Sequence, residues 1–257
     1  MLLRRVPRLG RSSKHGGYVR RITNFIVIAI LISTGVAAGS GLPPEVEDRL
    51  ENVISFDEAN DFVGSYRITI STLVQKPNGK SREEELIEAE VIRDGGGETV
   101  RRLIKYIENG TDVTEKKRAK FEGEEEDHGE GDDLADPFGD AADSYLFGSL
   151  ESRGSTKVIS FEPAPGHEDD DDMSRGSIAW DAESLEPRWL EMEAIHPPRP
   201  LRELRMRLEF QQIGDQLFLS RLVTDGLAKI LLLKREFHME MHFDDISWAE
   251  KHTESEE

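Results

Sequence analysis

Cysteine is absent from the chain of 257 residues. Its absence excludes disulfide bonds and thiolate chemistry, so even an exported domain would have to be stabilised by its core alone. It also excludes the attachment of a lipid to an N-terminal cysteine thiol. Because about two hundred residues follow the first forty, the chain is long enough to bury such a core.

Basic residues are few beyond the first segment of the chain. The whole chain has 33 lysines and arginines against 52 aspartates and glutamates, and seven of the basic residues lie before residue 22. Without residues 1–38, 26 basic residues face 52 acidic ones, which gives a net charge of −26. Such a balance repels nucleic acid and, over most of the surface, anionic lipid headgroups. We therefore expect no nucleic-acid partner, and cationic partners are favoured.

Signatures of common enzymes are missing as well. The sequence has no Gly-x-Ser-x-Gly elbow, no glycine-rich phosphate loop and no His-Glu-x-x-His motif. Carboxylates are so abundant that a pair of them is no signal for acid-base catalysis. We expect neither an enzymatic activity nor a cofactor.

Two polar clusters are candidates for a metal site. His238-x-Glu240-x-His242 would place two imidazoles and a carboxylate on one strand face, with alternate residues about 6.6–7 Å apart. That spacing is wide for ligands that bind one metal ion at about 2 Å. The acidic run from Glu168 to Asp172 lacks the spaced ligands and the tight glycine of a calcium loop. We interpret both clusters as solvated surface, and no metal is expected.

The N-terminal segment has the pattern of an export signal. Seven basic residues and no acidic one precede the apolar run from Ile22 to Ile32, and small residues follow from Ser33 to Gly39. We predict a signal peptide over residues 1–38, cleaved near Ala38, and a periplasmic or otherwise exported protein. The alternative is an uncleaved anchor over residues 22–38, which nearly reaches the roughly 17–25 apolar residues of a spanning helix.

Residues 39–249 are predicted to form a single domain that begins with a helix. Between Pro43 and Asn60, apolar residues recur with helical spacing and acidic residues occupy the first turn. This pattern predicts one amphipathic helix. Its part from Glu45 to Phe56 is the candidate lid of a ligand site.

After Asp61 the pattern changes to alternation of apolar and polar residues. Turn signals such as Asn109-Gly110, Gly214-Asp215 and Asp225-Gly226 separate the short runs. Alternation and turns of this kind predict an antiparallel meander, so the domain is mainly β. The predicted strands are Phe62–Gln75, Glu84–Arg93, Thr99–Glu108, Thr156–Glu162, Gly176–Asp181, Arg188–Ile195, Leu201–Gln212, Phe218–Thr224 and Lys229–Phe243.

Two charged stretches fall outside the predicted strands. Residues 122–143 are too acidic and too rich in glycine to bury a core, so we predict an acidic mobile loop. Residues 250–257 are likewise charged and predict a frayed tail.

The last third of the domain has the clearest two-sided strands. Eight apolar residues alternate with charged or polar ones there: Leu204, Met206, Leu208, Phe210, Phe237, Met239, Met241 and Phe243. Together with Trp189 they are the candidate ligand-binding residues, although such alternation is also typical of an ordinary core. One helix cannot cover the apolar faces of so many strands. A long, strongly curved sheet must then close on itself, bind something apolar, or do both.

The order of these elements resembles that of a known exported family. A signal segment and an amphipathic helix precede FVGSYRITI, and GSIAWDAESLEPRWLEMEAIHP and LEFQQIGDQLFLSRLVTDG follow. Between residues 43 and 248 this order is similar to that of the periplasmic carriers of outer-membrane lipoproteins, the LolA- and LolB-like proteins. The resemblance implies an incompletely closed β-barrel with a helical lid, whose cavity shields acyl chains in transit between membranes. It transfers no individual ligand-contacting residue to this chain.

Two functional hypotheses follow from the sequence. In the first, the protein is a non-catalytic carrier that binds acyl chains of a lipid or lipoprotein, with envelope membrane proteins as further partners. In the second, it is an exported interaction module with a filled core, and its acidic surface binds a cationic partner. The alternating faces favour neither hypothesis, because a filled core and an empty pocket require the same residues.

Overall fold

The computed structural model describes residues 42–51, 53–54, 62–93, 99–123, 142–170, 173–214, 216–230 and 233–250. The predicted signal peptide with its cleavage point, and most of residues 122–143 and 250–257, lie outside these ranges. No helix within the described ranges is long and apolar enough to cross a bilayer.

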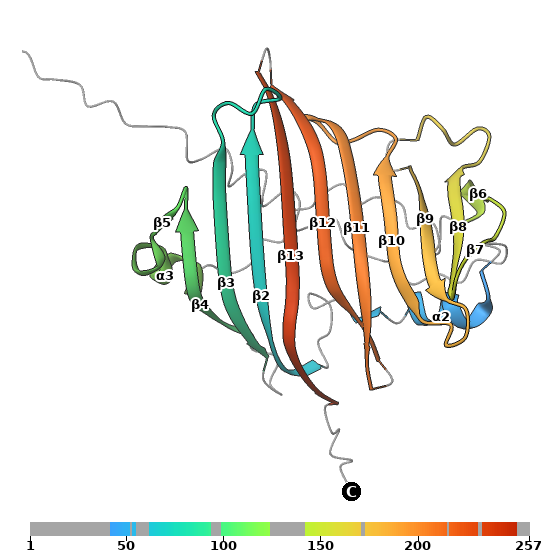
Figure 1. Cartoon of the computed structure of the whole chain (residues 1–257), viewed down its shortest axis with the longest axis horizontal. Coiled ribbons are helices and arrows are strands. Elements are labelled where there is room, and N and C mark those ends of the chain that lie inside the picture. The colour runs from blue at the N-terminus through green and yellow to red at the C-terminus, as the bar shows by residue number, and fades with distance from the viewer. Residues whose placement is uncertain are drawn as a thin grey trace, which may run out of the picture.

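A single sheet of thirteen strands dominates the described residues (Figure 1). The strands are β1 (Val53–Ile54), β2 (Phe62–Gln75), β3 (Glu83–Arg93), β4 (Thr99–Glu108), β5 (Thr111–Asp112), β6 (Tyr145–Phe147), β7 (Glu151–Arg153), β8 (Thr156–Pro163), β9 (Ser174–Asp181), β10 (Pro187–Ala194), β11 (Leu201–Ile213), β12 (Gln216–Ile230) and β13 (Leu233–Glu250). Neighbours pair in the order β5-β4-β3-β2-β13-β12-β11-β10-β9-β8-β6, with β1 beside β12 and β7 beside β8.

The sheet is open. No pairing among the described strands joins β5 to β6, so the sheet forms a curved, incompletely closed barrel. The pairing of β1 with β12 is parallel, and the others are antiparallel. The predicted mainly β, antiparallel class is therefore confirmed.

One departure from a simple meander lies at the centre of the sheet. β13 pairs with its predecessor β12 on one side and with β2 on the other. The register with β2 runs from Glu236 opposite Gln75 to Glu250 opposite Phe62. The last strand thus joins the first long strand to the rest of the sheet.

The hairpin between β12 and β13 differs from the prediction. Asp225-Gly226, predicted as a turn, lies inside β12. The predicted strand Lys229–Phe243 is also wrong, because the chain reverses between Ile230 and Leu233, which pair with each other. No glycine, asparagine or proline marks the reversal in the sequence, so the usual turn chemistry gave no signal there.

The N-terminal helix is shorter than predicted. Helix α2 spans Pro44–Glu51, not Pro43–Asn60, and Val53–Ile54 pairs with the start of β12. Both of these residues are branched at Cβ, which favours a strand over a helix. Val46 and Leu50 anchor α2 in the core, with 0 % and 2 % of their surface exposed. The rest of the predicted helix lies outside the described residues.

A second helix, α3 (Thr114–Glu122), covers β4 beyond the short strand β5, in a segment for which the sequence predicted no element. Its side chains form hydrogen bonds with the backbone of β4. The amide of Leu103 donates to Oε1 of Glu122 at 3.1 Å, and the carbonyl of Leu103 accepts from Arg118 at 2.6 Å. The helix therefore occupies the row of hydrogen bonds that a further strand would use. Glu122, predicted to begin the mobile loop, is the last residue of α3.

Candidate functional site

The eight apolar residues predicted on two strands share the inner face of β11 and β13. All of them belong to one buried cluster: Leu204, Met206, Leu208, Phe210, Phe237, Met239, Met241 and Phe243. β12 lies between these strands, and its Leu222 is opposite both Leu208 and Met241. The structure therefore brings the eight residues together on one face. Their contact with an apolar ligand stays a prediction.

The centre of this face is closely packed. Met206, Thr224, Met239 and Thr72 form one cross-strand row, and the side chains of Thr224 and Met239 are 0 % exposed. Oγ1 of Thr224 has no hydrogen-bond partner among the described residues, a situation that costs about 1–3 kcal/mol for a buried hydroxyl. Met239 consequently has no surface open to a ligand in this arrangement.

The inner face becomes more open toward β2. Tyr66, Ile68 and Ile70 continue the apolar face beyond β13, but they are only half-buried. The ring of Tyr66 lies 5.8 Å from that of Phe243, and Ile70 is opposite Met241. We call these three residues the β2 strip. The sequence placed them on a strand but not in the site, because alternation alone does not show which end of a face is covered.

Trp189 lies on the opposite face. It pairs with Glu209 and precedes Leu190, which is 2 % exposed and belongs to the inner-face core. The guanidinium of Arg207 stands over the indole ring, 4.8 Å from its centroid. Successive side chains of a strand point to opposite faces. Trp189 is therefore separated from the other eight candidates, which corrects its assignment to the same surface.

Charged side chains form a ladder across the outer face of β10 to β13. Arg207 pairs with Glu191 and, at 2.9 Å, with Glu209. Arg221 then connects Glu209, at 3.3 Å, to Glu240, at 2.6 Å. Each partly exposed pair contributes little by itself, but a network of this kind fixes the side chains of the face. The charged side chains of this outer-face ladder are therefore paired with one another. The inner face is the apolar face of the sheet.

The histidines of the His-x-Glu-x-His motif take part in this ladder. Nδ1 of His238 lies 2.8 Å from Oδ1 of Asp225, and Nε2 of His242 lies 2.6 Å from Oε1 of Glu240. Burial alone would raise the pKa of Glu240, but hydrogen bonds from Arg221 and His242 outweigh it, and the pKa is lowered. Within the described ranges, no group of three or more histidines and carboxylates is placed to hold a metal ion.

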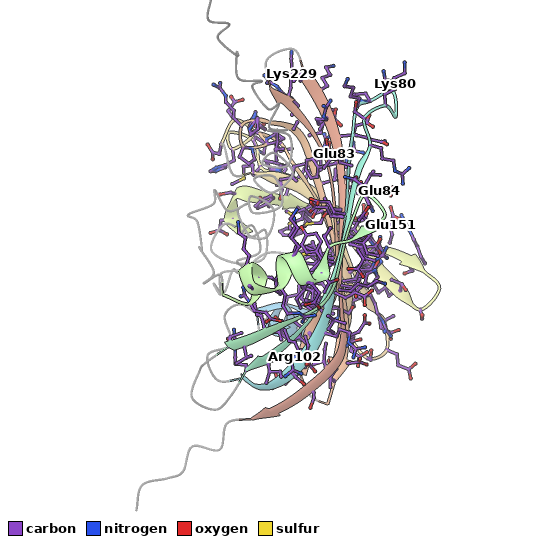
Figure 2. The ribbon with its side chains drawn as sticks, turned by 90° about the vertical axis from the view of Figure 1, so that its left-hand side faces the viewer. Lys80, Glu83, Glu84, Arg102, Glu151 and Lys229 are labelled. Atoms are coloured by element: carbon purple, nitrogen blue, oxygen red, sulfur yellow. The ribbon has the colours of Figure 1, made fainter. Side chains whose placement is uncertain are left out.

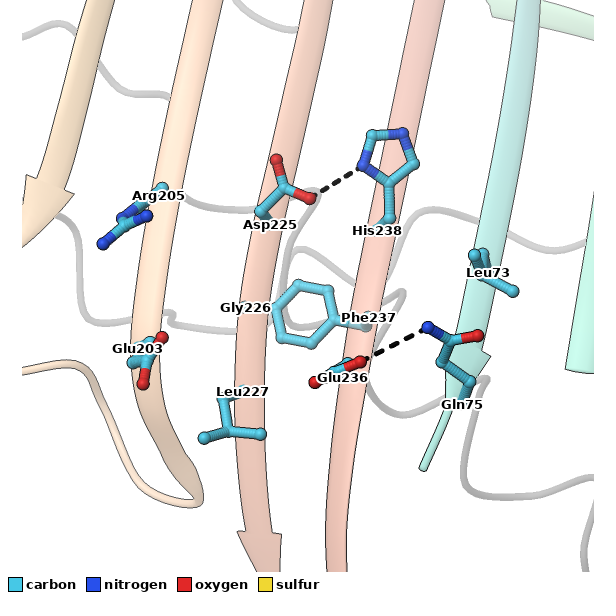
Figure 3. Close-up of a pocket in the computed structure, with 10 residues that line it drawn as sticks. All are labelled: Leu73, Gln75, Glu203, Arg205, Asp225, Gly226, Leu227, Glu236, Phe237 and His238. Atoms are coloured by element: carbon cyan, nitrogen blue, oxygen red, sulfur yellow. Dashed lines mark hydrogen bonds and ion pairs between the residues drawn. The ribbon is translucent and has the colours of Figure 1, made fainter. Parts of the chain in front are cut away.

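A pocket of about 340 Å³ opens on β2, β13, β12 and β11, lined by outer-face residues and by Gly226 and the inner-face residue Phe237 (Figure 3). Six of its ten lining residues are polar or charged, and they include both Glu203 and Arg205. Nε2 of Gln75 donates to Oε2 of Glu236 at 3.3 Å across its floor. Charges of both signs make this pocket unsuited to an acyl chain.

The comparisons with known proteins find similarity to solved structures alone. No protein-family model and no curated protein matches the chain. An outer membrane lipoprotein-sorting protein domain from Vibrio parahaemolyticus is 13% identical, with a TM-score of 0.34, over 83% of this chain and 93% of that one. MucB, in its complex with MucA from Pseudomonas aeruginosa, is matched by a structure that is 9% identical, with a TM-score of 0.22, over 81% of this chain and 99% of that one.

Proposed function

We propose that this chain is an exported, non-catalytic binding protein that carries an acyl chain of a lipid or lipoprotein against the inner face of its open sheet. The observation that carries the proposal is the β2 strip, an apolar part of the inner face that stays half-buried beside a closed core. Half-buried apolar residues on a sheet that does not close leave surface for an apolar ligand.

The expected affinity is that of a reversible carrier. Burial of each methylene group contributes about 0.8 kcal/mol to the binding free energy. Burial of about ten methylenes therefore supplies roughly 8 kcal/mol, the binding free energy of a micromolar complex. The cost of association is subtracted from this value. Met241 and Phe243 form the floor beside the strip. In this proposal they and the strip contact the ligand, while Met239 supports the floor from within.

The helix α2 has a structural role in this proposal and is not a lid. Its residues Val46 and Leu50 are buried in the core, and α2 lies near β8, β9 and β10 in Figure 1. β10 is four strands away from β2 in the order of the sheet. Moving α2 would expose core residues without uncovering the β2 strip. In this proposal the ligand reaches the β2 strip directly along β2, without the lid predicted over Glu45–Phe56.

A fluorescent fatty acid tests the proposal. Ile70→Asn places an amide in the β2 strip and is expected to weaken fatty-acid binding at least about tenfold, because the ligand would desolvate the amide without a partner. Its effect on the free energy of unfolding should stay below that of a core substitution, since Ile70 is only half-buried. Titration and urea unfolding of the same samples measure the two effects.

The matched control is Thr69→Asn, one residue earlier on the outer face of the same strand, opposite His242. It should leave fatty-acid affinity within about twofold of the parent. A parent protein that binds no fatty acid, and yields no lipid on organic extraction, would end the carrier proposal. The filled-core interaction module with an acidic surface would then remain.

A further inference from the structure

The sequence that joins β12 to β13 lacks the usual turn residues. Ile230 and Leu233 are paired, and Leu231 and Leu232 separate them in the sequence. Two-residue connections between antiparallel strands normally carry Asn, Asp or Gly, because their backbone angles require it. Leu233 is 58 % exposed. Such breaks with local rules are expected at functional sites.

Cationic side chains surround this hairpin. Lys229 and Lys234 lie directly opposite each other beside it, and Arg235 follows. The neighbouring β2–β3 connection adds Lys76 and Lys80, because Gln75 at the end of β2 pairs with Glu236 of β13. Figure 2 shows Lys80 and Lys229 at the same end of the molecule. We call Lys76, Lys80, Lys229, Leu233, Lys234 and Arg235 the cationic tip.

The lysines of the cationic tip differ in their ion pairs from the arginines on the outer face of the sheet. No ion pair joins the side chains of Lys76, Lys80, Lys229 or Lys234 to an acidic residue in the described part of the chain. Arg205, Arg207 and Arg221 on the outer face of β11 and β12, by contrast, are paired. Like charges directly opposite each other destabilise a strand pair. Lys229 and Lys234 therefore oppose local stability and favour an external anion.

The acidic residues near the tip do not cancel its charge. Glu84 is paired with Arg82. Glu83, Glu203 and Glu236 are three further carboxylates near the tip, against its four lysines and one arginine. The acidic segment Glu168–Asp170 belongs to the connection after β8, at least three strands from β12. At about 4.8 Å per strand this is roughly 14 Å, beyond the Debye length of about 8 Å at physiological salt.

We propose that the cationic tip docks the protein on the surface of an anionic lipid bilayer. An apolar side chain flanked by lysines is the combination that such a surface binds, because leucine enters the interface while the lysine stems stay beside it and the ammonium groups reach the phosphates. The rest of the strongly acidic surface is repelled, so the contact is confined to this end. The proposal goes beyond acyl-chain carriage and holds whether or not the protein carries a lipid.

Vesicle flotation tests this docking with protein isolated from cells that express the full chain. Binding is expected to vesicles of phosphatidylglycerol and phosphatidylcholine, weaker at high salt, and not to phosphatidylcholine alone. Lys234→Glu should weaken it by about fivefold or more, since each basic residue near the surface contributes a factor of that order. Lys116→Glu is the matched control and should leave binding unchanged. Lys116 is an exposed lysine of α3 that forms no ion pair with any described residue.

A second readout uses the absence of cysteine. Leu233→Cys labelled with an environment-sensitive dye should show a blue shift on the anionic vesicles, and Lys116→Cys labelled in the same way should show none. Equal binding to both kinds of vesicle, or binding that Lys234→Glu leaves unchanged, would overturn the proposal. Binding of an acidic peptide by a protein that binds neither kind of vesicle would also overturn the proposal. It would identify an acidic protein as the partner of the tip.

Discussion

Met239→Lys is expected to unfold the domain or to lower its free energy of unfolding by at least about 4 kcal/mol. The side chain of Met239 is completely buried, and its neighbours in the register are Thr224 and Thr72. Neither supplies a negative charge. An unpaired ammonium group there loses its hydration, at an effective penalty of several kcal/mol, against a total stability of about 5–15 kcal/mol. Urea unfolding followed by circular dichroism measures the loss.

His238→Lys is the control for this substitution. His238 precedes Met239 on the same strand but lies on the outer face, with 41% of its side chain exposed and Asp225 within 2.8 Å. A lysine there keeps a carboxylate neighbour and stays hydrated, so the change in stability should remain within about 1 kcal/mol. If both variants were equally stable, the assignment of Met239 to the interior would be wrong.

Gly176→Ala is expected to lower the free energy of unfolding by about 3 kcal/mol or more. A Cβ at this position of β9 would overlap the backbone carbonyl oxygen of Glu191 on β10 and press on the ring of Phe161. A backbone cannot rotate away as a side chain can, so β9 and β10 would have to separate. The gain of about 0.4–1 kcal/mol from restricting the unfolded chain is too small to offset this.

The next residue supplies the control for Gly176. Ser177→Ala, on the same strand and paired with Glu191, adds no atom to the structure and should change stability by less than about 1 kcal/mol. Thermal unfolding of the two variants in parallel distinguishes them. A Gly176→Ala protein as stable as Ser177→Ala would contradict the close approach of β9 and β10.

Strand positions were largely predictable because their signal is local. The bounds of β2 and β4 agree with the prediction, since alternation of apolar and polar residues depends only on neighbours in sequence. The buried side of β11 and β13 was predictable for the same reason. Alternation does not show which residue lies opposite on the neighbouring strand. The wrong predictions concerned features that depend on that residue.

Gly226 illustrates this limit. Beside Asp225 it has the sequence of a turn, but it lies within β12 because the ring of Phe237, directly opposite on β13, occupies the space that a side chain would need. Glycine is required at this position because of a residue that lies eleven positions later in the sequence. No rule based on sequence neighbours identifies this requirement. A glycine beside an acidic residue predicts a turn only when nothing packs over it.

The candidate site was predictable in composition but not in extent. Met239 and its neighbours were correctly placed inside, yet the half-buried β2 strip depends on how far the core reaches across the sheet. Trp189 shows the opposite problem. A tryptophan in a strand usually anchors a core, but here the guanidinium of Arg207 covers its ring on the charged face.

The position of β13 has a consequence for how the chain folds. In the described ranges, β13 alone connects the group from β2 to β5 with the group from β6 to β12, and the side chains of Gln75 and Glu236 that meet across this seam are 161 positions apart. Contacts so distant in sequence form slowly. Until β13 is in place, β2 and β12 present unpaired edges that attract other strands. For an exported chain, as proposed above, the sheet is complete only after β13 has crossed the membrane, and the unpaired edges need protection from aggregation until then.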